Sequence, residues 1–323
     1  MAARRRRYGA RGVTVAGTVL AIVGPTAAGK SALSLALADR LGGEVVNADS
    51  MQLYRGMDIG TAKLTPAERR GINHHVLDVW PVTQSASVAE YQRLARAAID
   101  DIVARGRGPL LVGGSGLYVR AALEHFEFPG TDPELRARLE AELATVGSGP
   151  MHARLASVDP AAAARILPSN GRRVVRALEV IELTGAPFAA ALPDPTPVYP
   201  SVQVGMDLDT ATLDARIASR VRHMFDAGLV DEVRALLPEG LADGRTASRA
   251  LGYQQVLAYL HGRSDLAQAA ADTIQATRRF VRRQRTWFHR DPRIGWPDAT
   301  APNLVDDVIA MMERGPTAMT GEP

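Results

Sequence analysis

A short segment near the N-terminus carries the most specific chemical motif of the sequence. It reads GPTAAGKS and fits the pattern G-x-x-x-x-G-K-[ST] at every position. In such a loop the glycines let backbone N–H groups face phosphate oxygens, the lysine adds a point charge, and the last hydroxyl can ligate Mg²⁺. The predicted diphosphate-binding residues are therefore Gly24, Pro25, Thr26, Ala27, Ala28, Gly29, Lys30 and Ser31, with Ser31 as the candidate metal ligand.

A carboxylate follows the next predicted strand. An ordinary P-loop NTPase has an Asp at the end of a further apolar strand, but here Pro109–Val112 ends in Gly113-Gly114-Ser115-Gly116. The strand that ends in an acid is Glu44–Ala48, followed by Asp49. Because parallel strands open onto one crevice at their carboxyl ends, Asp49 is expected near the loop. It could hold Mg²⁺ through water or take a proton from a nucleophile, or it could be a simple turn residue.

The elements around these residues predict an α/β fold. Apolar Thr18–Val23 leads into the loop, and an amphipathic helix follows it directly. Further strands are expected at His75–Val79 and Val202–Asp207, with a helix over Val88–Arg105 between the early ones. This alternation predicts a P-loop NTPase-like, doubly wound, mainly parallel sheet.

The middle of the chain predicts a separate domain. Asp132-Pro133 and Asp159-Pro160 each place a capping residue before a proline suited to a first helical turn. Those helices should run to about Val146 and Leu167, and a third should cover Arg172–Leu183. We therefore predict an all-helical insertion over 131–199, a core over 18–130 and 200–312, and disordered tails over 1–17 and 313–323.

Composition excludes several classes of protein. The chain has 323 residues, is 46% hydrophobic and 23% charged, and so is globular rather than disordered. It contains no Cys, which excludes disulfides, thiolate zinc sites and a catalytic thiol. Arg4–Arg7 and the apolar Val13–Val23 resemble a secretory signal. The apolar run is about half the roughly 20 residues of a membrane span, so we expect a cytoplasmic protein with no membrane partner.

The late part of the chain is rich in arginine. Arg278 to Arg293 contains seven Arg, one His and the single acid Asp291. On a helix, Phe280 and Trp287 lie on one apolar side, which arginine rows flank. Such a helix could dock on a core and offer phosphates a cationic stripe, or it could be a solvated basic face. The two rows are Arg278, Arg282 and Arg285, and Arg279, Arg283 and Arg290.

Several motifs, in the same order, resemble those of the tRNA dimethylallyltransferases, the IPP transferase family. The resemblance covers about residues 18 to 298, and its DS-x-Q…M-x-I-G-T-A-K block is long and specific. Besides the phosphate loop, the matching segments are Asp49-Ser50-Met51-Gln52-Leu53-Tyr54, Met57-Asp58-Ile59-Gly60-Thr61-Ala62-Lys63, His74-His75, Leu111 to Tyr118, Gly252-Tyr253, and Arg278…Arg282-Arg283-Gln284…Thr286-Trp287.

The resemblance implies transfer of a dimethylallyl group from dimethylallyl diphosphate to N6 of the adenine next to the tRNA anticodon. The loop, Lys30 and Mg²⁺ would hold the diphosphate leaving group, and Asp49 would accept or orient the N6 proton. Ser115, where the family has Thr, and Arg220 would contact the diphosphate. Arg220 shares a helix face with Arg216; alternatively it is a solvated surface charge.

The resemblance also implies tRNA contacts. Met51 and Gln52 match the segment that meets the flipped-out adenine. The family often has Asn-Asp-Pro-Gln-Arg where this chain has Ser169-Asn170-Gly171-Arg172-Arg173, so Arg173 carries over and the other contacts are in doubt. The protein is expected to act as a monomer on the anticodon stem-loop. The candidate tRNA-binding residues are Asp49, Ser50, Met51, Gln52, Ser115, Arg136, Arg172, Arg173, Arg249, Gly252, Tyr253, Arg278, Arg282 and Arg283.

Three alternatives fit parts of the sequence. An adenylate isopentenyltransferase runs similar chemistry on free nucleotides, but would have little use for the insertion and the basic helix. A small-molecule P-loop kinase would consume ATP, whereas prenyl transfer releases diphosphate without it. A nucleic-acid-binding P-loop protein would leave Asp49 incidental. Lys63, the only lysine besides Lys30, has no assigned role beyond its motif.

Overall fold

The chain folds into two compact units in a computed structural model that describes residues 17–126, 128–188 and 196–315. The first unit comprises Met1–Glu124 and Pro197–Pro323, and the second comprises His125–Thr196. The insertion thus begins and ends slightly earlier than the expected 131–199. Residues 1–16 and 316–323, most of the expected tails, lie outside the described residues. The second tail cannot begin at 313, because a helix continues to Arg314.

The first unit is built on a six-stranded sheet in the order β3-β2-β4-β1-β5-β6. Every pairing is parallel, which agrees with the predicted doubly wound sheet. The strand that leads into the phosphate loop lies between β4 and β5 and is buried along its whole length. The strands are β1 (Val19–Val23), β2 (Glu44–Asn47), β3 (His74–His75), β4 (Pro109–Gly113), β5 (Ser201–Gly205) and β6 (Ile294–Gly295).

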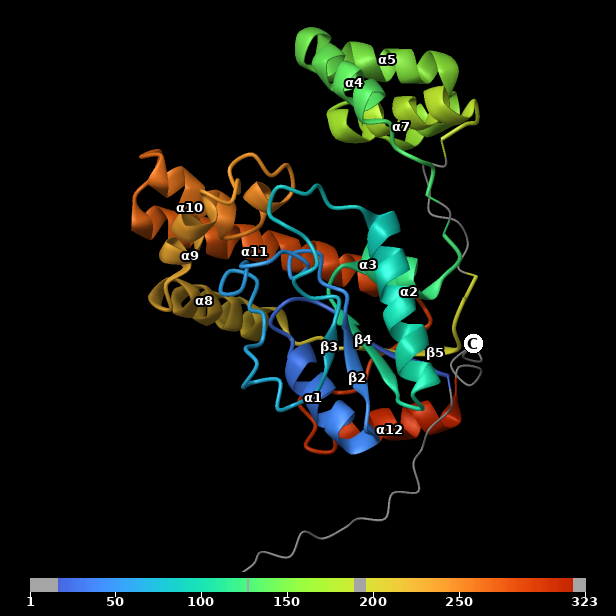
Figure 1. The fold of residues 1–323 in the computed structure, drawn as a ribbon, viewed down its shortest axis with the longest axis vertical. Helices are drawn as coiled ribbons and strands as arrows, with labels where there is room; N and C mark the ends of the chain where they lie inside the picture. The colour runs from blue at the N-terminus through green and yellow to red at the C-terminus, as the bar shows by residue number, and fades with distance from the viewer. Residues whose placement is uncertain (1–16, 127, 189–195, 316–323) are drawn as a thin grey trace, which may run out of the picture. The chain divides into compact units, whose positions relative to one another are not determined.

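Helices cover both faces of the sheet (Figure 1). Successive residues of β1 point to opposite faces: Ala21 joins a cluster with Tyr91 of α2, and Ile22 joins a cluster with Leu37 of α1. The helices of this unit are α1 (Lys30–Leu41), α2 (Val88–Ala104), α3 (Gly116–Leu123), α8 (Thr210–Asp226), α9 (Leu229–Leu236), α10 (Tyr253–Leu260), α11 (Leu266–Phe288) and α12 (Leu304–Arg314).

Two sheet elements differ from the sequence-based expectation. The strand expected at His75–Val79 is wrong beyond His75, because Val76 and Asp78 have φ values of 61° and 56° and cannot continue an extended chain. The short strand β6 pairs with β5 in a segment where no strand was predicted. This strand has only two residues and lies between Pro292 and Pro297, so it is too short to show an alternating apolar pattern.

The second unit is all-helical over its described residues, as predicted. Asp132 and Asp159 cap α4 and α6 by accepting hydrogen bonds from backbone N–H groups two or three residues later. The helix α5 was not predicted, and it carries Pro150 in its first turn. Proline is tolerated there since first-turn N–H groups have no partner within the helix. The helices are α4 (Pro133–Val146), α5 (Ser148–Val158), α6 (Pro160–Arg165) and α7 (Gly171–Thr184).

A two-stranded neck marks where the chain leaves the first unit and returns to it. The backbone N–H of Val198 donates to the carbonyl of Leu123 at 2.8 Å, and that of His125 donates to Thr196 at 2.7 Å. Glu124 and Pro197 form the antiparallel bridge between them. Within the described ranges, none of the helices combines the length and apolar character needed to cross a bilayer.

Candidate active site at the carboxyl ends of the central strands

The phosphate loop connects β1 to α1 and requires glycine at its first position. Gly24 has a φ of 128°, and a Cβ atom there would lie 2.2 Å from the carbonyl oxygen of Met206, just after β5. Gly29, with a φ of 103°, precedes the first residue of α1. The free N–H groups and the positive end of the helix dipole therefore lie beside the loop, where an anion can bind.

Lys30 is the central cation of the loop. Its Nζ donates to the carbonyl oxygen of Pro25 at 2.7 Å. Burial lowers the pKa of Lys30 to about 8, the negative charge of Asp49 opposes that shift, and Arg220 adds to it. The charges of Asp49 and Arg220 thus both act on Lys30, and for Asp49 this closeness was expected from the strand order.

The helix α8 brings two arginines toward the loop. Arg216 Nη1 lies 3.4 Å from the carbonyl oxygen of Ala27, to which it donates. Burial lowers the pKa of Arg220, with Asp49 raising it and Arg216 lowering it further. Arg220 is exposed on α8, but it lies close enough to the loop for its charge to act on Lys30.

Asp49 is held in a fixed orientation two residues beyond β2. Its Oδ1 accepts a hydrogen bond from the backbone N–H of Met51 at 2.9 Å, and its own N–H donates to Asn47 Oδ1 at 2.9 Å. The Tyr91 hydroxyl donates to the carbonyl of Asn47 at 3.0 Å. Burial, with Asp49 contributing, raises the pKa of both Tyr91 and Tyr118, so both phenols stay neutral beside this carboxylate.

Ser115 links the loop after β4 to the segment after β2. Its Oγ lies 3.3 Å from both the backbone N and the Oγ of Ser50. A Cβ at Gly113 would lie 2.2 Å from the carbonyl oxygen of Ala48, so glycine permits this close approach. The Ser115 hydroxyl and Asp49 are thereby brought to the same edge of the sheet.

The residues at this edge fit a weakly held Mg²⁺. Ser31 is exposed at the start of α1, next to a cavity of about 40 Å³ that Asn47, Gln52 and His74 also line. No group of three His, Cys, Asp or Glu side chains that could hold a metal occurs among the described residues. One hydroxyl and a nearby carboxylate suit Mg²⁺, which usually takes few protein ligands and shares the oxygens of a bound phosphate.

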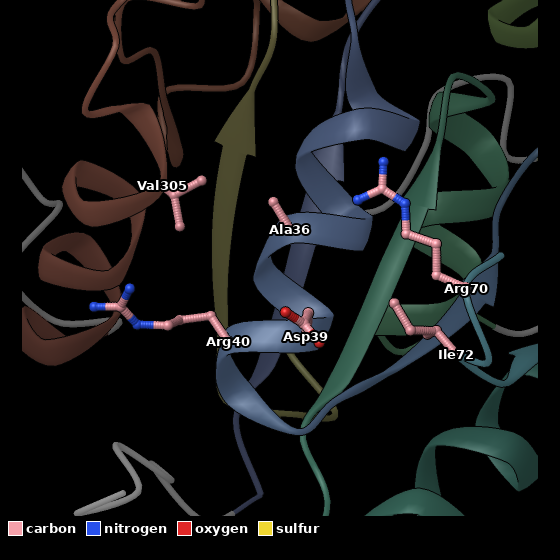
Figure 2. Close-up of a pocket in the computed structure, with 6 residues that line it drawn as sticks. All are labelled: Ala36, Asp39, Arg40, Arg70, Ile72 and Val305. Carbon is pink, nitrogen blue, oxygen red and sulfur yellow. The ribbon is translucent and has the colours of Figure 1, made fainter. Parts of the chain in front are cut away.

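A larger cavity of about 340 Å³ lies elsewhere (Figure 2). Ala36, Asp39 and Arg40 of α1 line it together with Arg70 and Val305. Arg40 is ten residues along the helix from Lys30, or about 15 Å. This cavity is therefore separate from the phosphate loop.

Comparison with known proteins identifies the family. A sequence model described as IPP transferase matches residues 52–291. The chain belongs to this family. It is 74% identical over 294 residues to a tRNA dimethylallyltransferase of Salinispora arenicola, covering 91% of this chain and 86% of that protein. A tRNA dimethylallyltransferase of Streptomyces avermitilis is 64% identical, with coverage of 93% and 97%.

Solved structures of similar proteins show the same fold. A full-length tRNA isopentenylpyrophosphate transferase from Bacillus halodurans has a TM-score of 0.69 at 38% identity, covering 94% of this chain and 98% of that one. A eukaryotic dimethylallyltransferase acting on tRNA has a TM-score of 0.76 at 26% identity, with coverage of 91% and 77%. The family and fold class expected from the motifs are both confirmed.

In this IPP transferase, Lys63 has a structural environment that the sequence did not reveal. Its Nζ lies 2.6 Å from a carboxylate oxygen of Asp58 and of Asp78, and 3.0 Å from the carbonyl oxygen of Tyr54. The side chain is only 3% exposed. Lys63 therefore links Tyr54, Asp58 and Asp78, and so holds in place the motif of residues 57 to 63 that follows Asp49.

Gly252 and Tyr253, expected at the tRNA surface, are buried instead. The Tyr253 hydroxyl donates to Glu232, whose carboxylate also accepts hydrogen bonds from the backbone N–H groups of residues 58 to 60. A Cβ at Gly60 would lie 2.4 Å from the Tyr253 ring. The hydroxyl and ring of Tyr253 therefore hold this motif in place, and its contact with tRNA stays a prediction.

The arginines of α11 divide into two sets. Arg278 and Arg282 lie 3.5 and 3.7 Å from a carboxylate oxygen of Asp214 in α8, and Arg285 lies 2.9 Å from one of Asp207. The first predicted row, Arg278, Arg282 and Arg285, therefore holds α11 against Asp214 and Asp207 as well as contributing positive charge. In the second row, Arg279 and Arg283 are exposed on α11, and Arg290 is exposed two residues beyond the end of the helix. The Arg283 guanidinium lies 5.7 Å from the Phe280 ring centre.

The predicted arginines outside α11 also have distinct surroundings. Arg136 is paired at 2.6 Å with Glu179, a fully buried carboxylate that Arg176 also contacts. Arg172 and Arg173 are exposed at the start of α7, and Arg249 is exposed in the short 3₁₀ turn Ala247–Arg249. Arg136 thus stabilises the helical unit, whereas the other three are accessible.

Proposed function

We propose that this protein is a tRNA dimethylallyltransferase that modifies N6 of the adenine next to the anticodon. The observation that carries the proposal is a phosphate loop whose Lys30 ammonium lies close enough to the Asp49 carboxylate and the Arg220 guanidinium for both charges to shift its pKa. The cations suit a diphosphate leaving group, and the carboxylate suits the proton of an attacking amine. A phosphoryl-transfer enzyme would place its acid after a different strand.

The proposed reaction assigns each residue a role. A bond forms between adenine N6 and C1 of the dimethylallyl group, the C1–O bond breaks, and its electron pair leaves with the diphosphate. Lys30, Arg220 and the loop N–H groups stabilise the growing negative charge, and the Ser115 hydroxyl donates to the diphosphate. Asp49 accepts the N6 proton, which an aromatic amine releases only as the new bond forms.

Mg²⁺ belongs to the proposal as a partner of the diphosphate. Ser31 would hold it, with Asp49 near enough to contribute through water. When bound, the ion neutralises charge on the leaving group. The protein residues keep their roles in orienting the diphosphate and accepting the proton.

The tRNA would meet two basic surfaces. One is the exposed second row of α11 with Arg282, and the other is Arg172 and Arg173 of the helical unit. The adenine must leave its stack to reach Asp49, Met51 and Gln52, and a single-stranded loop allows this at low cost. With tRNA as substrate we also propose a cytoplasmic location, and a monomer, because one chain supplies every residue of the site.

An incubation with labelled dimethylallyl diphosphate tests the proposal. The protein and Mg²⁺ are mixed with either unmodified tRNA or AMP, without ATP. We expect label in tRNA and an equal amount of released diphosphate. Label in AMP alone would indicate an adenylate isopentenyltransferase, and label in neither, with ATP turnover on other substrates, would indicate a kinase.

A further inference from the structure

Gln284 of α11 is a buried polar side chain that reaches both loops of the site. Its Oε1 accepts a hydrogen bond from the backbone N–H of Thr26 at 3.0 Å, and its Nε2 donates to the carbonyl oxygen of Gly114 at 2.8 Å. The residue is 5% exposed. A Cβ at Gly114 would lie 2.3 Å from Nε2, so the amide fills the space between the loops.

The hydrogen bond to Thr26 acts on the same peptide group that Lys30 contacts. The carbonyl of Pro25 and the N–H of Thr26 belong to one rigid plane and point in opposite directions. Lys30 binds the carbonyl side and Gln284 binds the N–H side. Gln284 therefore fixes the orientation of the peptide that holds the Lys30 ammonium. Without Gln284 this partly buried N–H would lose its hydrogen-bond partner, which has a cost in free energy.

The same turn of α11 also fixes the second loop. The Gly114 carbonyl that Gln284 binds directly precedes Ser115, whose hydroxyl lies against Ser50. Trp287 packs against Gly116, where a Cβ would lie 1.9 Å from its Nε1. A single helical turn thus sets the spacing between the Lys30 and Ser115 loops.

We propose that Gln284 is a positioning residue that sets the affinity for the diphosphate group from within the basic helix. It orients Lys30 through the Pro25–Thr26 peptide and orients Ser115 through the Gly114 carbonyl. The proposal rests on the proposed function for the identity of the ligand.

Three variants of the full chain test this role. Gln284→Met keeps the length of the side chain without its hydrogen bonds, and Gln275→Met makes the same change at an exposed position of α11. Gln284→Glu keeps the acceptor for Thr26 but sets a carboxylate oxygen against the Gly114 carbonyl. Isothermal titration with Mg²⁺ and inorganic diphosphate should show affinity reduced about tenfold or more in both Gln284 variants and unchanged in Gln275→Met.

A second measurement needs no ligand. With only two lysines, ¹³Cε-labelled protein gives one signal for Lys30 and one for Lys63. Gln284→Met should shift the Lys30 signal and leave that of Lys63 in place. Failure of the wild type to prenylate tRNA would remove the proposed function, while this signal would still test Gln284.

Circular dichroism would identify which variants are folded. A folded Gln284 variant with wild-type diphosphate affinity and an unmoved Lys30 signal would overturn the proposal. If such a variant differed from the wild type only in a lower melting temperature, Gln284 would contribute to packing and not to diphosphate binding. If Gln284→Met does not fold, Gln284→Glu carries the same test, because it has nearly the volume of the native side chain.

Discussion

At the scale of residues, the site depends on charges that lie close together although they are far apart in the chain. Asp49 follows β2, Lys30 begins α1, and Arg220 lies within α8. Asp49 and Arg220 both shift the pKa of Lys30, and Asp49 also shifts that of Arg220. Their separate contributions can be tested. Asn is nearly isosteric with Asp49, and the NMR signal of Lys30 can be followed directly.

Asp49→Asn should abolish prenyl transfer while leaving tRNA binding intact. The Asn Oδ1 can still accept from the Met51 N–H, as Asp49 does at 2.9 Å, so the local turn is kept and only the charge is lost. Losing a general base should lower the turnover rate roughly 10²–10⁴-fold. Single-turnover assays and a tRNA filter-binding assay would measure the two effects, and near-normal turnover would remove Asp49 from the mechanism.

Lys30 should titrate with a midpoint near pH 8, because burial lowers its pKa to about 8. As pH rises through this value Lys30 loses its charge, whereas an ordinary lysine keeps it to about pH 10. Diphosphate affinity should therefore fall above pH 8, and bound diphosphate should raise the midpoint. The ¹³Cε signal, assigned with Lys30→Arg, measures this; a midpoint above 10 in the free protein would contradict it.

Residues that act through local motifs were predictable, and residues that act through distant partners were not. The positions of Lys30 and Asp49 followed from the loop pattern and the rule for parallel strand ends. The environments of Lys63 and Tyr253 depend on Asp78 and Glu232, which no local spacing indicates. The burial of Gln284 could have been predicted from the sequence, because this polar residue lies on the apolar side of the helix with Val281 and Phe288.

At the scale of elements, α11 serves both as a docking helix and as a basic surface. Its inner side carries Val281, Gln284 and Phe288, which are buried. The flanking arginines bind the acids Asp214 and Asp207, and the outer arginines remain exposed. Sequence periodicity predicted the two sides but not these ion pairs, because their acids come from another part of the chain.

Arg282→Ala combined with Arg283→Ala should weaken tRNA binding most at low salt. Both side chains are exposed, and losing phosphate contacts should reduce the slope of log affinity against log salt by about 1–2. Arg40→Ala with Arg70→Ala is the matched control, since it removes the same charge at the separate cavity (Figure 2). An equal effect of the two double variants, or an unchanged slope, would make α11 an ordinary solvated face.

At the scale of the whole molecule, the two units have separate apolar cores. Leu139, Leu155 and Val174 belong to a cluster within the helical unit. The two clusters around the sheet draw on described residues of the first unit alone. The sequence predicted this division from the change in pattern near Thr131, although the true boundary lies at the neck.

Replacing residues 125–196 with an Asn-Gly turn should leave a folded first unit. The paired chains at Glu124 and Pro197 are already antiparallel, which suits a two-residue hairpin connection. The shortened protein should bind Mg²⁺ and diphosphate like the wild type, but bind tRNA more weakly because Arg172 and Arg173 are gone. Calorimetry and filter binding measure these, with Lys30→Ala in the same background as the non-binding control; an unfolded product would contradict the separation of cores.

The neck also bears on how such an enzyme can arise. Because Leu123 and Val198 are hydrogen-bonded neighbours, one in-frame insertion between them adds the whole helical unit without reordering any strand of the sheet. A gene for a compact enzyme of small substrates could gain a surface for a polymer in a single recombination event. The reverse deletion would rejoin the same two neighbouring residues.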